Sequence, residues 1–61
     1  MKIKCLIIDD EPLAQRVLEL YTLDVPSLDL VQKCNNALDA IEILKEQKID
    51  LIFLDINMPK L

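Results

Sequence analysis

Hydrophobic residues along the chain form three short clusters, separated by two segments in which apolar positions recur with a helical period. Residues 3–8 (IKCLII) and 49–54 (IDLIFL) are nearly continuous apolar runs with β-branched residues, which is typical of strands buried on both faces. Residues 28–34 (LDLVQKC) mix apolar and polar side chains, which suits a strand at the edge of a sheet. The pattern therefore predicts three strands, two of them interior.

The two intervening segments have the spacing of amphipathic helices, and we expect helices over about 11–22 and 36–47. Pro12 suits the first turn of a helix, where its missing N–H costs nothing, and Asn36 is a good N-cap residue. The apolar stripe of the first helix, expected to contribute to the core, consists of Leu13, Ala14, Val17, Leu18 and Tyr21.

The resulting order is strand, helix, strand, helix, strand. Helical crossovers imply parallel strands joined by right-handed connections. The two apolar strands should be neighbours, and the mixed strand should lie outside the first one. This predicts the α/β class, with spatial strand order 2-1-3, which is the first half of a flavodoxin-like doubly wound parallel sheet.

Composition excludes several kinds of function. The 61 residues include no glycine, which excludes glycine-rich dinucleotide and phosphate loops. Because compact α/β domains normally use glycine in turns, we expect the chain to be part of a domain. A net charge of −4 argues against a surface for nucleic acid or anionic membranes. No apolar run approaches the roughly 20 residues of a membrane span.

The two cysteines, Cys5 and Cys34, lie in the predicted strands. The chain has no histidine and no CxxC motif, so a zinc site is not expected. We interpret both cysteines as reduced, buried side chains, which is consistent with a cytoplasmic location.

Acidic residues follow the two apolar strands. Asp9 and Asp10 come after the first, and Asp55 comes after the third. Each acid alone could be a helix-dipole partner or a turn former. However, parallel neighbours lie about 4.8 Å apart, so the three carboxylates should converge where ligands bind in such sheets. Carboxylates at such a short separation repel one another unless they share a cation. A site made of oxygen ligands suits Mg²⁺.

Two segments carry a family resemblance. CLIIDDEP at 5–12 and LIFLDINMP at 51–59 resemble the first strand with its acidic pair and the D-x-x-M-P phosphoacceptor segment of bacterial response-regulator receiver domains. The resemblance implies that residues 1–61 form a partial receiver domain, the remainder being absent. A sensor histidine kinase would be the partner, and the domain would be a phosphoacceptor rather than an enzyme.

The same resemblance implies a role for each site residue. Asp55 would accept the phosphoryl group and bind Mg²⁺. Asp10 would bind Mg²⁺ directly and Asp9 through water, with the backbone carbonyl of Asn57 as a further ligand.

The segments 9–14, 36–44 and 50–59 look most like regulators with a LytTR-type DNA-binding output domain. Contact with DNA would then occur only through an output domain absent from this chain. The hydroxyl residue and lysine that bind the phosphoryl group in receivers are also absent, so the chain alone is not expected to be competent in signalling.

Two other functions stay open. A Mg²⁺-dependent phosphohydrolase of haloacid-dehalogenase type would also use an aspartate nucleophile after an apolar strand. However, its second acid corresponds to Asn57, which cannot transfer a proton. A non-catalytic interaction module would use the acids only as caps. We also expect self-association, because the far edge of residues 49–54 is apolar and offers little to prevent pairing with another chain.

Overall fold

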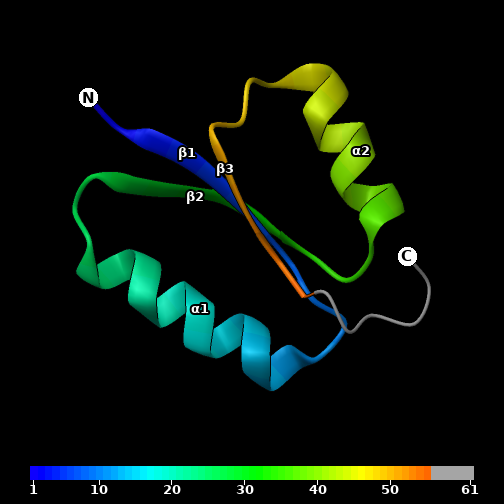
Figure 1. The fold of residues 1–61 in the computed structure, drawn as a ribbon, viewed down its shortest axis with the longest axis horizontal. Coiled ribbons are helices and arrows are strands. Elements are labelled where there is room, and N and C mark those ends of the chain that lie inside the picture. Colours follow the sequence, from blue (N-terminus) through cyan, green and yellow to red (C-terminus); the bar gives the residue numbers. More distant parts are fainter. Residues whose placement is uncertain (56–61) are drawn as a thin grey trace.

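The computed structural model describes residues 1–55 of the chain. Its elements are β1 (Ile3–Ile8), α1 (Pro12–Asp24), β2 (Leu28–Cys34), α2 (Ala37–Glu46) and β3 (Leu51–Leu54). The strands form one parallel sheet in the order β2-β1-β3, which confirms the predicted α/β class and strand order. Figure 1 shows α1 on one side of the strands and α2 on the other.

The core lies around β1, the central strand. Leu6 and Ile8 pack with Cys34 and Ala40 on the side of α2. Because side chains alternate along a strand, the remaining buried residues of β1, Cys5 and Ile7, face the side of α1. The pairing of β1 with β2 shifts by one residue between Cys5 and Leu6, after which Ile8 lies opposite Cys34.

Both cysteines are free and buried, as predicted. Burial raises the pKa of each thiol above its ordinary value, and nearby Asp29 and Asp39 raise the pKa of Cys5 and Cys34 respectively. The thiolate is the reactive form, so both side chains act as small hydrophobic residues at neutral pH.

The helix boundaries differ by one or two residues from the approximate ranges expected from the sequence. Helix α1 begins at Pro12 rather than 11, because Glu11 is the N-cap and its side chain accepts a hydrogen bond from the N–H of Leu13. It ends at Asp24 rather than 22. Helix α2 spans Ala37–Glu46 rather than 36–47, because Asn36 is its N-cap and accepts from the N–H of Asp39 at 2.9 Å.

The third strand is also shorter than the expected range of about 49–54, because β3 begins at Leu51. The N–H of Asp50 donates to the carbonyl of Lys4 at 2.8 Å, but a side-chain oxygen of Asp50 accepts from the N–H of Lys4 at 3.1 Å. The side chain thus takes the place of a backbone partner just before the strand. Ile49 packs against the core cluster on the side of α2.

The apolar stripe predicted for α1 is largely exposed. Leu13 and Tyr21 are 71% and 65% exposed, whereas the polar residues Gln15 and Thr22 are only 8% and 3% exposed. Helix α1 contacts β1 and β2 but not β3 within residues 1–55. The face of α1 that is buried is therefore set by its position over β1 and β2, not by the apolar stripe alone.

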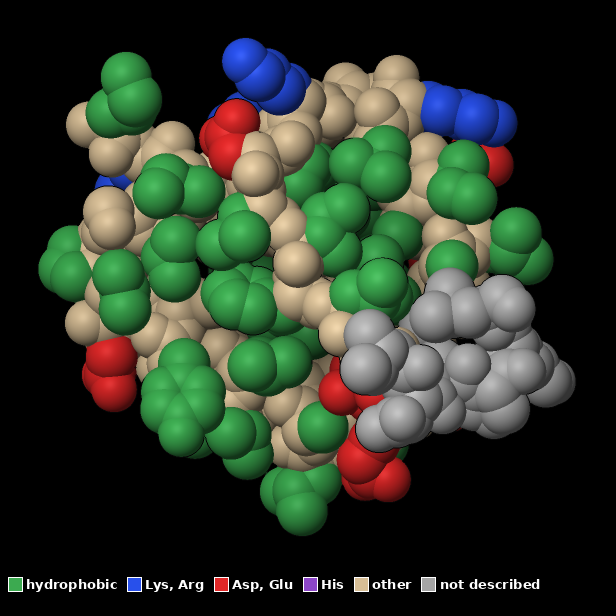
Figure 2. All heavy atoms as spheres, in the orientation of Figure 1, with side chains coloured by type: hydrophobic (Ala, Val, Ile, Leu, Met, Phe, Trp, Pro, Cys, Tyr) green, Lys and Arg blue, Asp and Glu red, His purple; other side chains and the backbone are tan. Residues whose placement is uncertain are grey.

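Strand β3 contacts β1 and neither helix in the described part of the chain. Its side chains Leu51, Ile52 and Leu54 are consequently exposed. Figure 2 shows hydrophobic side chains spread across this view of the molecule. None of the helices described is long and apolar enough to cross a membrane.

Candidate functional site

The candidate site lies where β1 and β3 end. Ile8 and Leu54, the last residues of these strands, are opposite each other. The N–H of Asp55 donates to the carbonyl of Ile8 at 3.0 Å, and the N–H of Asp9 donates to the carbonyl of Cys34 at 3.0 Å. The ladders on both sides of β1 therefore continue one residue beyond the strands, which places Asp9 next to Asp55.

The structure brings together the three acids singled out from the sequence. Asp9, Asp10 and Asp55 each offer a carboxylate oxygen within 4.8 Å of the others. Asp9 is buried, Asp55 is partly exposed and Asp10 is exposed, so the cluster is open to solvent on one side. Asn57, the fourth residue singled out, lies outside the described residues, as do Met58 and Pro59 of the D-x-x-M-P segment.

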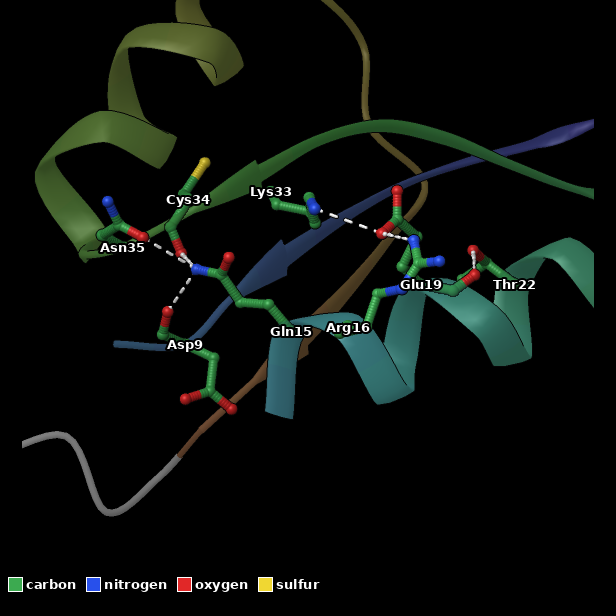
Figure 3. A network of polar contacts seen from close by, with 8 residues as sticks. All are labelled: Asp9, Gln15, Arg16, Glu19, Thr22, Lys33, Cys34 and Asn35. Carbon is green, nitrogen blue, oxygen red and sulfur yellow. Dashed lines mark hydrogen bonds and ion pairs between the residues drawn. The ribbon is translucent and has the colours of Figure 1, made fainter. Parts of the chain in front are cut away.

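Local hydrogen bonds fix the conformation of Asp9. Its Oδ1 accepts from the N–H of Glu11 at 2.9 Å, which holds the carboxylate over the start of α1. Its carbonyl accepts from Nε2 of Gln15 at 2.6 Å. In Figure 3 the carboxylate of Asp9 points away from the Gln15 amide. The Asp9 side chain is thus oriented by the turn that joins β1 to α1.

Sequence reasoning missed Gln15. Its position three residues before Leu18 and seven before Thr22 puts it on one face with both, and this spacing was the available signal. As a polar residue in a predicted amphipathic helix, it was assigned to no role.

The donor set fits a hard divalent cation. All three side chains offer oxygen, which is the ligand type of Mg²⁺. Two oxygens bound to one Mg²⁺ at about 2.1 Å can be at most about 4.2 Å apart. Carboxylate oxygens within 4.8 Å of one another are close enough to share one such ion, which usually takes one or two carboxylates directly and keeps several waters.

Comparison with known proteins identifies the family. The response regulator receiver domain matches residues 5–61. The chain belongs to this family. Its members are signalling domains, so the family resemblance of the sequence is confirmed at this level.

Several relatives are named transcriptional regulatory proteins. Transcriptional regulatory protein BtsR of Escherichia coli (strain K12) is 39% identical over 59 residues, and BtsR of Salmonella typhimurium (strain LT2) is 41% identical over the same length. These alignments cover 97% of this chain and 25% of each relative. Protein MrkE of Klebsiella pneumoniae is 38% identical over 60 residues, which is 98% of this chain and 22% of MrkE.

The chain thus spans about a quarter of the length of these curated relatives. No solved structure matches it.

Proposed function

We propose that this chain is part of a receiver domain in which Asp55 accepts a phosphoryl group from a sensor histidine kinase. One observation carries the proposal: in a chain of the receiver family, the carboxylate of Asp55 lies within 4.8 Å of those of Asp9 and Asp10, where two parallel strands end. Ligand sites in open parallel sheets occur at such an edge.

The proposed reaction is a direct transfer. A carboxylate oxygen of Asp55 forms a bond to phosphorus while the bond from phosphorus to the histidine nitrogen breaks. The electron pair of that bond returns to the imidazole, and the product on Asp55 is an acyl phosphate. Partial exposure of Asp55 supports this role, because the phosphohistidine must approach from solvent.

We propose Mg²⁺ as the cofactor. Asp10 and Asp55 would bind it directly and Asp9 through water, with the carbonyl of Asn57 as a further ligand beyond the described residues. When bound, Mg²⁺ supplies positive charge that offsets the charge of the transferred phosphoryl group. Asp9 suits the indirect position because it is buried and one of its oxygens already accepts from Glu11.

The proposed partners are a sensor histidine kinase and an output domain. Two of the relatives are named transcriptional regulatory proteins, which supports an output that binds DNA, and the LytTR type stays the specific proposal. We propose that the reaction takes place in the cytoplasm, which agrees with two free cysteines that lie on different strands.

We also propose that the 61-residue chain self-associates through β3. Within residues 1–55 this strand pairs only with β1, and three of its four side chains are exposed hydrophobic groups. An apolar edge of this kind is a template for pairing with another strand.

Acetyl phosphate and Mg²⁺ followed by intact-mass measurement test the phosphoacceptor role in the full-length gene product. We expect one added phosphoryl group, absent from the Asp55→Asn variant and retained in Asp50→Asn. Asp50 is the matched control because it is the acid at the opposite end of the same strand. Equal labelling of the Asp55→Asn variant would refute the assignment.

A further inference from the structure

Gln15 is a buried amide that joins three segments of the chain. Its Nε2 lies 2.6 Å from the carbonyl of Asp9, 3.1 Å from that of Cys34 and 2.9 Å from Oδ1 of Asn35. Figure 3 shows these contacts, with the amide reaching from α1 between the ends of β1 and β2. An NH₂ group has two hydrogens, so the three acceptors share them. These hydrogen bonds compensate for the free-energy cost of burying the polar amide.

The contacts of Gln15 converge on the segment that carries the acidic pair. The N–H of Asp9 donates to the same Cys34 carbonyl that accepts from Gln15. The carbonyl of Asp9 then accepts from Gln15 itself, so both backbone polar groups of Asp9 are held at the ends of the two strands.

The orientation of the Asp9 carbonyl also affects the backbone at Asp10. It belongs to the peptide unit that joins Asp9 to Asp10, and this unit is planar. Fixing the direction of the carbonyl therefore fixes the direction in which the chain enters Asp10. Asp10 is exposed, so surrounding side chains pack little against it. A hydrogen bond made by Gln15 thus constrains the backbone of both acids.

We propose that Gln15 is a positioning residue for the Mg²⁺ site, holding the Asp9–Asp10 peptide so that both carboxylates face Asp55. This proposal rests on the proposed function and adds to it a residue that touches neither the metal nor the phosphoryl group. Residues that hydrogen-bond to metal ligands without touching the metal commonly act in this way. Their loss lowers metal affinity roughly 10–100-fold.

If Gln15 only stabilised the fold, its loss would lower stability without a specific effect on Mg²⁺ binding. Gln15 also joins α1 to the end of β2, so its loss should lower stability in either case. Thr22 provides the matched control, because it is the other buried polar residue of α1 and its hydroxyl donates to the carbonyl of Glu19 at 2.7 Å. Thr22 lies seven residues further along the helix and makes none of the contacts of Gln15.

The experiment compares Gln15→Met with Thr22→Val in the full-length gene product. Methionine keeps the length of the side chain and removes the donor, and valine does the same for threonine. The dissociation constant for Mg²⁺ is measured by calorimetry at a temperature where circular dichroism shows both variants folded. Amide hydrogen exchange of Glu11, whose N–H donates to Oδ1 of Asp9, is measured without metal. We expect Gln15→Met to weaken Mg²⁺ binding about tenfold and to accelerate exchange at this amide, and Thr22→Val to change neither.

The outcomes separate the two proposals. Wild-type affinity and exchange in Gln15→Met, in a protein that binds Mg²⁺ and is labelled on Asp55, would overturn the role of Gln15 and leave the proposed function standing. Equal loss of affinity in both variants would also overturn it, since that would indicate general destabilisation. A wild-type protein that neither binds Mg²⁺ nor is labelled would refute both proposals.

Discussion

The three carboxylates of the site differ in how much water they contact. Asp9 is buried, Asp55 is partly exposed and Asp10 is exposed, although their oxygens lie within 4.8 Å of one another. Three negative charges at this separation repel one another, and a cation bound among them relieves the repulsion. Since a ligand that binds the folded state stabilises it, the site should couple metal binding to stability.

The first prediction follows for Asp10. Mg²⁺ should raise the melting temperature of the wild-type protein, and Asp10→Asn should abolish most of this increase because it removes the side chain proposed to bind Mg²⁺ directly. Thermal unfolding followed by circular dichroism, with and without Mg²⁺, measures the effect. Asp24→Asn is the control, since Asp24 lies at the other end of α1 and should leave the increase intact. The same increase in Asp10→Asn as in wild type would exclude Asp10 from the site.

Glu19 provides a second prediction away from the site. Hydrogen bonds from Lys33 at 3.1 Å and Arg16 at 3.0 Å lower the pKa of its carboxyl below the ordinary value of 4.5, with Lys33 contributing most. A lowered folded-state pKa stabilises the fold above the unfolded pKa, and this contribution is lost as pH falls through the folded one. The Lys33 contact also links β2 to α1.

Carbon-detected NMR titration measures this pKa directly. The midpoint for Glu19 should lie below 4.5 in wild type and rise more in Lys33→Met than in Arg16→Met. A wild-type midpoint at or above 4.5 would show that the ion pairs are not maintained in solution.

At the scale of whole elements, β3 differs from the other two strands. It contacts only β1 among the described elements, so its hydrophobic side chains on both faces lack a covering helix. The third prediction is that a lysine on this strand reduces self-association of the 61-residue chain, because a charge at a strand edge opposes pairing.

Sedimentation velocity at micromolar concentrations tests this prediction with a matched pair of variants. Ile52 in β3 is 40% exposed and Ile41 in α2 is 46% exposed. We expect wild type and Ile41→Lys to form larger species as concentration rises, and Ile52→Lys to remain monomeric. A wild-type chain that is monomeric and folded over the whole range would contradict self-association through β3.

The same elements show how far the sequence predicts the structure. The kind and order of the elements follow from hydrophobic period, and strand order follows from which strands are apolar on both faces. The start of β3 was missed because the Asp50 side chain competes with the backbone for Lys4. The buried face of α1 was missed because periodicity identifies an apolar stripe but not the elements that cover it, as the exposed Tyr21 illustrates.

Like the fold, the candidate site could be predicted only in part from the sequence. The convergence of Asp9, Asp10 and Asp55 depends only on strand order and on where the strands end, so it could be predicted from the sequence. The contacts of Gln15 depend on how closely α1 approaches the ends of β1 and β2. Such an approach is set by tertiary packing, which leaves no local signal beyond the position of Gln15 on one face with Thr22.

For the molecule as a whole, we propose that one end of the parallel sheet is a phosphoacceptor site. The site and the apolar surface of β3 are adjacent, because Asp55 directly follows that strand. Figure 2 shows hydrophobic side chains across the middle of the view and acidic side chains at several places around them. Phosphorylation of Asp55 would thus place new negative charge at the end of the strand with the exposed apolar edge.

The most direct test of this claim locates the phosphoryl group. After reaction of the full-length gene product with acetyl phosphate and Mg²⁺, borohydride reduces an acyl phosphate of aspartate to homoserine, and peptide mass spectrometry identifies its position. We predict homoserine at position 55 only, and none when Mg²⁺ is removed by a chelator. Homoserine at position 9 or 10, or none in the Mg²⁺-treated protein, would contradict the proposed phosphoacceptor site.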